Sequence, residues 1–228
     1  ILFLSTGRPG IAYAITFAIT NITFIVSIQN TNVANTLIMV ALAPMLSAIL
    51  GLIFLKENPE KKTWIAITIT TLAVVYIFYD SIQIGNFYGD FFGLVTAFGL
   101  AAGAVIIRSA KNRNLVPSAV LGKLIVAFVA VFFVENFELV GKDVIIVPAM
   151  CILCVAIPFV LVTIAPRYIT AAEVNLFFLL ETILGPIWVW LVIREEPSFE
   201  TIVGGLIIIT TIGIHSFLAL KKTQTKTT

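Results

Sequence analysis

Two ionisable residues lie inside long apolar stretches of this sequence, and both could take part in binding chemistry. Lys123 stands in VPSAVLGKLIVAFVAVFF, and Glu181 stands in NLFFLLETILGPIW. A charge inside a bilayer costs on the order of 2.5–3.5 kcal/mol, so each is a candidate for substrate binding or ion coupling. Each follows the expected start of its helix by about eight positions, or roughly 12 Å. We therefore predict that they form an ion pair, for which a substrate or a proton competes.

Each of these residues also has a plainer interpretation. Lys123 can reach the cytoplasmic headgroups with its long stem, and Glu181 can form a structural hydrogen bond. Two amides are further binding candidates: Asn21 near the middle of its stretch and Asn175 close to a helix start. The alternative for Asn21 is a hydrogen bond between helices. The alternative for Asn175 is a capping or interfacial position.

Three prolines and one histidine complete the set of candidate residues. Pro44, Pro158 and Pro186 lie within apolar stretches. A proline in a membrane helix frees a backbone carbonyl and permits a bend. We predict that these prolines are gating bends, although prolines are also common in membrane helices. His215, near the end of the last apolar stretch, can titrate, but an interfacial position is favoured.

No pattern in the sequence indicates a metal site, a cofactor or an enzyme. Cys151 and Cys154 form C-x-x-C inside an apolar run, and no second cysteine or histidine pair accompanies them. We therefore interpret them as small apolar side chains. The sequence contains no H-E-x-x-H, no G-x-S-x-G and no G-x-x-x-x-G-K-[ST] loop. An intramembrane enzyme is disfavoured, and any transport must use an ion gradient, exchange or facilitation.

Composition places the chain in a membrane. Its residues are 60% hydrophobic and 11% charged, whereas soluble domains carry about 25% charged residues. The net charge of +2 and the lack of a basic run with aromatics argue against a nucleic-acid partner. A helix that crosses a bilayer needs about 20 apolar residues, and eight stretches qualify. They are about residues 10–29, 32–55, 63–79, 87–108, 115–134, 144–165, 172–193 and 201–219.

The distribution of lysine and arginine sets the orientation. With the C-terminal tail in the cytoplasm, eleven of the 14 Lys and Arg residues lie on the cytoplasmic side, as the positive-inside rule expects. Only Lys142 and Arg194 lie outside, and Lys123 lies within a span. We predict an integral membrane protein with a cytoplasmic C-terminus.

Two segments of the sequence repeat one pattern. LAPMLSAILGLIFLKENPEKKTW, residues 42–64, aligns at an offset of 138 with LETILGPIWVWLVIREEPSFET, residues 180–201. Both contain a basic residue, Glu, a Pro two positions later and a Thr. Five predicted helices start between the beginning of the first copy's helix and the beginning of the second copy's helix. Because five is an odd number, the two copies have opposite orientations in the membrane, as in many secondary transporters. The alternative is that helix ends generally favour such residues.

These units resemble the paired EamA-type domains of the drug/metabolite transporter superfamily. The resemblance rests on VANTLIMVALAPMLSAILGLIFLKENPEKKTW, GDFFGLVTAFGLAAGAVIIRSA and AAEVNLFFLLETILGPIWVWLVIREEPSFETIVGGLIII. It implies an all-α polytopic membrane protein of two inverted five-helix repeats. Because the family typically has ten helices and this chain has eight, we expect the first repeat to be incomplete. Residues 1–80 would hold helices 3–5, residues 86–220 helices 6–10, and residues 221–228 a cytoplasmic tail.

The resemblance also implies a function. We expect an exporter of a small organic metabolite, amino acid or drug-like compound, working by alternating access in a prokaryotic plasma membrane. The alternative is a non-transporting accessory subunit or an inactive fragment. The expected partners are the substrate, the lipid bilayer, and either a second copy or the missing N-terminal helices. Gly99 and Gly103 form G-x-x-x-G, which we expect to pack helices within the chain.

Overall fold

The computed structural model describes residues 6–31, 33–79, 87–133, 138, 141–180, 184, 190–191, 194 and 199–225. Over these ranges all regular structure is helical, so the predicted all-α class is confirmed. The α-helices are α1 Gly7–Asn30, α2 Val33–Val40, α3 Ala43–Leu50, α4 Lys61–Phe78, α5 Phe87–Ser109, α6 Val116–Val131, α7 Asp143–Met150, α8 Ile157–Ile164, α9 Ala171–Phe178 and α11 Phe199–Thr225. Gly51–Leu55 and Cys151–Ala156 are π-helical, and Ala165–Arg167 is a 3-10 turn.

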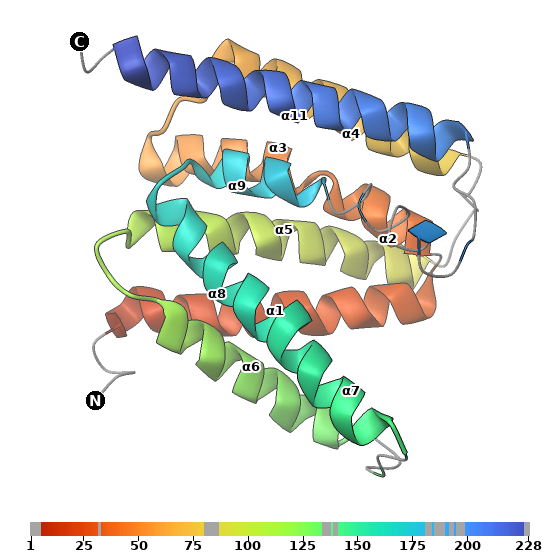
Figure 1. Ribbon diagram of the computed structural model, residues 1–228. Helices are drawn as coiled ribbons and strands as arrows, with labels where there is room; N and C mark the ends of the chain where they lie inside the picture. Colours follow the sequence, from red (N-terminus) through yellow and green to blue (C-terminus); the bar gives the residue numbers. More distant parts are fainter. Residues whose placement is uncertain are drawn as a thin grey trace.

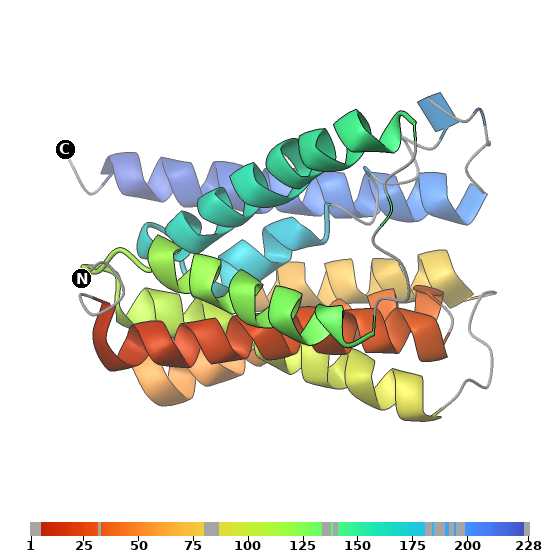
Figure 2. The same ribbon diagram turned by 90° about the horizontal axis from the view of Figure 1, so that it is seen from below.

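The helices lie side by side, and successive spans run in opposite directions (Figure 1). As a result, α1 begins and α11 ends at the same side of the bundle. Helices α7 and α8 are inclined to α1 in both views (Figures 1 and 2). None of residues 141–154 is buried against other parts of the described chain.

Within the described ranges, four helical segments are long and apolar enough to cross a membrane. They are Gly7–Asn30, Asn35–Leu55, Phe87–Ser109 and Asp143–Arg167. Val116–Val131 and Ile202–His215 are shorter apolar helices. The predicted spans at 32–55 and 144–165 are not uniform α-helices, since each contains a π-helical segment. Of the predicted span at 172–193, residues 172–178 belong to α9. Most of the residues after 180 lie outside the described ranges.

Helices α1 and α5 approach each other through glycine. Gly99 of α5 faces Thr20 of α1, and Gly103 faces the ring of Tyr13 at 3.5 Å from the position of an added Cβ. At Gly99 an added Cβ would overlap the Thr20 hydroxyl. The predicted packing role of this G-x-x-x-G pair within the chain is therefore confirmed.

A separate apolar core joins α3, α9, α4 and α11, which we call the four-helix core. Its members are small or branched apolar side chains that pack closely together. They include Ala48, Ala66, Ile67, Val74, Leu176, Ile208 and Ile212. Gly204 of α11 lies against Ile77 and the Ala73 carbonyl of α4, so α4 and α11 are also in close contact.

The offset of 138 residues recurs in the backbone geometry. Helix α9 begins at Ala171 and helix α4 at Lys61, and the residues 138 positions away from them, Val33 and Phe199, lie in helices α2 and α11. Lys56 and Arg194 are also separated by this offset, and they have φ angles of 55° and 67°. In the described residues, they alone among non-glycines have positive φ. Such a conformation is uncommon outside glycine and typical of a helix C-terminal cap.

Candidate functional site

Lys123 lies where α1, α6 and α8 meet, and we call this place the Lys123 junction. Its Nζ donates a hydrogen bond to Oδ1 of Asn21 on α1 at 2.7 Å. The same atom lies 4.1 Å from the ring centroid of Phe159 on α8 and 5.2 Å from that of Phe17 on α1. Ring faces attract a cation electrostatically. The ammonium thus contacts one amide oxygen and two aromatic rings.

The local sequence explains how the α1 side of this junction is built. Phe17 and Asn21 are four residues apart, so they share one face of the helix. Nδ2 of Asn21 donates to the Phe17 carbonyl at 2.7 Å, which leaves Oδ1 for Lys123. Gly122 of α6 lets the two helices approach, because an added Cβ would lie 2.8 Å from the Phe17 ring and 2.9 Å from the Ala14 carbonyl.

Two features of the junction favour a ligand that carries negative charge. An ammonium has three N–H donors, and Asn21 accepts one of them. Within the described residues, no carboxylate forms an ion pair with Lys123. Glu181, the predicted ion-pair partner, lies outside the described residues, so that pairing stays a prediction. The partner that the structure gives to Lys123 is Asn21.

Asn175 lies in the interface between α9 and α3. Its Nδ2 donates to Ser47 Oγ at 2.6 Å and to the Ala171 carbonyl at 3.2 Å. The residue is only 1% exposed and is the fifth residue of α9, so the alternative of a capping position is wrong. Thr170 caps α9 instead, through a reciprocal capping box with Glu173. Oδ1 of Asn175 is buried and has no hydrogen-bond partner among the described residues.

A small pocket opens between α3 and α9. Its lining includes Ser47, Gly51, Glu57 and Thr170, and its volume is about 30 Å³. This volume suits water and not an organic substrate. The pocket as the structure has it is therefore too small to hold an organic substrate.

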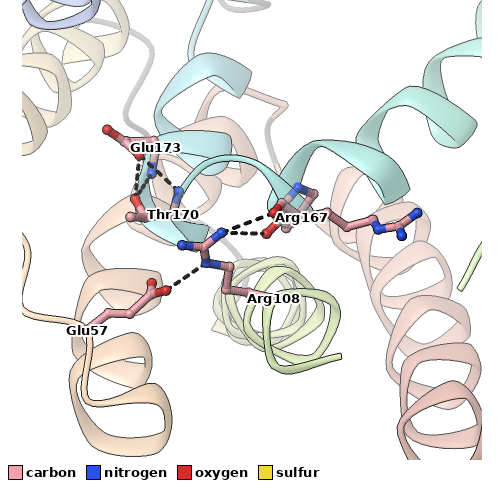
Figure 3. A network of polar contacts seen from close by, with 6 residues as sticks. Glu57, Arg108, Arg167, Thr170 and Glu173 are labelled. Atoms are coloured by element: carbon pink, nitrogen blue, oxygen red, sulfur yellow. Dashed lines mark hydrogen bonds and ion pairs between the residues drawn. The ribbon is translucent and has the colours of Figure 1, made fainter. Parts of the chain in front are cut away.

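A polar network joins three connections between helices at one end of the bundle, which we call the basic end because Arg108, Lys111 and Arg167 lie there (Figure 3). Arg108, at the end of α5, donates from Nε to Glu57 at 2.7 Å. Its Nη1 donates to the carbonyls of Pro166 and Arg167 at 3.4 and 3.3 Å. Arg167 Nε in turn donates to the Lys111 carbonyl at 2.7 Å. The network ties the chain after α3 to the end of α5 and to the turn between α8 and α9.

Pro44 and Pro158, two of the three proposed gating prolines, stand where one helical segment gives way to another. Pro44 is the second residue of α3 and follows the break between α2 and α3. Pro158 is the second residue of α8 and follows the π-helical segment Cys151–Ala156. Pro186 lies outside the described residues. The breaks are structural facts, and the gating role of the prolines stays a prediction.

His215 and the cysteines have no binding geometry of their own. His215 is buried between α11 and α4, where its Nε2 is hydrogen-bonded to Thr63 Oγ1 at 3.1 Å. Cys151 and Cys154 are exposed and free. The part of the chain that the structure describes holds no group of His, Cys, Asp and Glu side chains that could bind a metal ion.

Sequence reasoning missed the aromatic side of the Lys123 junction and the partners at the basic end. Phe17 carried a usable signal, since it stands four residues before Asn21 on a helix. Phe159 carried none, because its place beside Lys123 depends on how α8 packs. The ion pair of Glu57 with Arg108 likewise joins residues that are distant in sequence.

Comparisons with known proteins agree with this architecture. A search of the curated proteins gives no significant match. A solved structure titled "Crystal structure of protein" is similar in fold, with a TM-score of 0.75 at 14% identity, over 95% of this chain and 91% of that one. The model of the EamA-like transporter family matches residues 7–79 and 87–217. Because this match spans most of the sequence, the chain belongs to the EamA-like transporter family.

Proposed function

We propose that this protein is a secondary-active transporter that exports a small organic compound by alternating access. Family membership makes it a membrane transporter of the drug/metabolite transporter superfamily. The substrate class, the direction and the mechanism are our proposals. So are a prokaryotic plasma membrane location and a cytoplasmic C-terminus.

The observation that carries the mechanism is the recurrence of one offset in the backbone. Lys56 and Arg194, the non-glycine residues of the described chain with positive φ, are separated by 138 residues, which is the offset between the two repeated sequence segments. We interpret residues 1–80 and 86–220 as two repeats of opposite orientation. The close contact of α4 with α11 supports this, because two related elements that lie beside a two-fold axis contact each other across it.

Inverted repeats matter because they can form a similar gate on either side of one site. In this arrangement the Lys123 junction is the site. The network of Glu57 and Arg108 holds the basic end closed, and substrate passage to that side requires the network to open. The helix breaks at Pro44 and Pro158 supply the bends for this motion, since a π-helical or interrupted segment re-forms its hydrogen bonds more readily than a regular helix.

Transport in liposomes tests the proposal. The full-length protein is reconstituted, and the liposomes are loaded with a radiolabelled panel of amino acids, aromatic carboxylates and aromatic amines. We expect release of at least one compound above the leak of protein-free liposomes. We expect this release to fall in Lys123→Gln and Glu181→Gln but not in Lys142→Gln, which alters an exposed residue. Release equal to the leak for every compound would contradict transport and favour the accessory role.

A further inference from the structure

The Lys123 junction has a charge that its own surroundings balance only in part. Its ammonium is half-buried among Asn21, Phe17 and Phe159. An amide oxygen and ring faces stabilise a cation through partial charges. A buried charge is costly unless it is fully paired and hydrogen-bonded. The site is therefore short of one negative charge as the described residues build it.

We infer that the substrate of this transporter is an organic anion, whose carboxylate binds the Lys123 ammonium while its apolar body packs beside Phe159. This inference rests on the proposed transport function, because it names the substrate class of the same site. It also assigns Asn21 a positioning role, since Asn21 holds the ammonium between α1 and α8.

The geometry favours a carboxylate over a neutral or cationic group. Asn21 accepts one of the three N–H donors, and the remaining donors suit the oxygens of a carboxylate through charge-assisted hydrogen bonds. A cationic ligand would repel the ammonium, and an alcohol would leave the charge unbalanced. Phe159 is edge-to-face with the buried Phe17, at a centroid distance of 5.0 Å, and its partly exposed ring offers an apolar surface to the rest of the ligand.

The depth of the junction argues against a lipid headgroup as the ligand. Lys123 is the eighth residue of α6, so it lies roughly 10 Å along the helix from its start at 1.5 Å per residue. Lipid phosphates lie at the bilayer surface, outside the hydrocarbon layer of about 30 Å. A small anion that enters from water fits this position better than a phosphate that is anchored in the headgroup layer.

Equilibrium dialysis of the full-length protein in detergent tests the inference. The ligands are radiolabelled 3-phenylpropanoate, its neutral counterpart 3-phenylpropan-1-ol, and inorganic phosphate. The variants are Lys123→Gln, Lys123→Arg and the exposed control Lys142→Gln, each checked by size-exclusion chromatography and thermal unfolding. We expect saturable binding of the carboxylate alone by the wild type and by Lys142→Gln. We expect at least tenfold weaker binding by Lys123→Gln and partial recovery in Lys123→Arg.

Several results would overturn the inference: equal binding of acid and alcohol, unchanged binding by a folded Lys123→Gln, saturable binding of phosphate but not of the carboxylate, or no carboxylate binding by a folded wild type. The outcome is separable from the proposed function. Liposome flux of neutral or cationic compounds alone leaves the transporter and removes the anion site. Carboxylate binding without any flux leaves the anion site and removes the transporter.

Discussion

The four-helix core and the Lys123 junction differ in what they contribute to the stability of the bundle. The core joins α3, α9, α4 and α11 through side chains such as Ile67, Leu176 and Ile208, which are almost fully buried. The junction of α1, α6 and α8 holds a half-buried ammonium that would pack more favourably as an apolar residue. The core thus contributes stability, whereas the junction retains a group that costs stability. Such a group is expected where binding requires it.

The sharpest way to break the core is to fill its closest helix contact. In Gly204→Leu, the added Cβ would lie 3.2 Å from the Ala73 carbonyl and would overlap Ile77. We expect the free energy of unfolding to fall by about 1–3 kcal/mol, as for other overpacked interiors. Thermal unfolding in detergent measures this change. Gly213→Leu, on the same helix with open space around it, is the matched control and should leave the stability close to that of the wild type.

The converse change removes the charge at the junction. In Lys123→Gln, we expect binding and transport to fall at least tenfold, or about 1.4 kcal/mol, while thermal stability stays equal or rises. This contrast follows because glutamine avoids the cost of burying a charge. Parallel flux and unfolding measurements check it. A large loss of stability together with the loss of flux would make Lys123 part of the scaffold and would remove the distinction between the two regions.

The amide in the core should behave differently from the amide at the junction. Asn175→Ala removes the hydrogen bond to Ser47, and we expect a loss of about 0.6 kcal/mol, with an upper bound near 1.7 kcal/mol, as for hydrogen bonds between membrane helices. Asn21→Ala should lower ligand affinity more than stability. A double-mutant cycle of Asn175→Ala with Ser47→Ala checks the first assignment. Additive effects would show that the pair is not coupled.

The smallest effect belongs to the ion pair at the basic end. The Glu57 and Arg108 side chains are 28% and 19% exposed, so we expect Glu57→Gln to lower stability by only about 0.2–1 kcal/mol, and less at high salt. Its larger consequence should be greater access from the side of the membrane where Arg108 lies, because we propose that this network closes that end. Unfolding at low and high ionic strength measures the first effect. A loss that is independent of salt would contradict an electrostatic role.

The sequence predicted the fold more fully than the site because apolar length and charge distribution are properties of each segment alone. The span at 87–108, for example, corresponds closely to α5, Phe87–Ser109. The π-helical segments at Gly51–Leu55 and Cys151–Ala156 were not predicted. They depend on local backbone adjustments that no residue type marks.

Single residues of the site were predicted, but the contacts between them were not. Lys123 and Asn21 were both identified as candidates, because polar groups stand out in an apolar helix. Their mutual hydrogen bond was not predicted, since it depends on the close approach of α1 and α6 at Gly122. Asn175 was placed near a helix end, whereas packing of α9 on α3 buries it. The sequence pattern does not predict which helices contact each other when they are distant in the sequence.

Thiol accessibility at the junction tests the central claim most directly. In a background that lacks Cys151 and Cys154, Lys123→Cys is compared with Leu124→Cys. The Leu124 side chain is exposed on the apolar surface of α6. A charged, membrane-impermeant thiosulfonate is added to sealed vesicles of either orientation. Alternating access predicts that Lys123→Cys reacts from both sides of the membrane while Leu124→Cys reacts from neither. A Lys123→Cys variant that reacts from one side only, or from neither, would contradict the account.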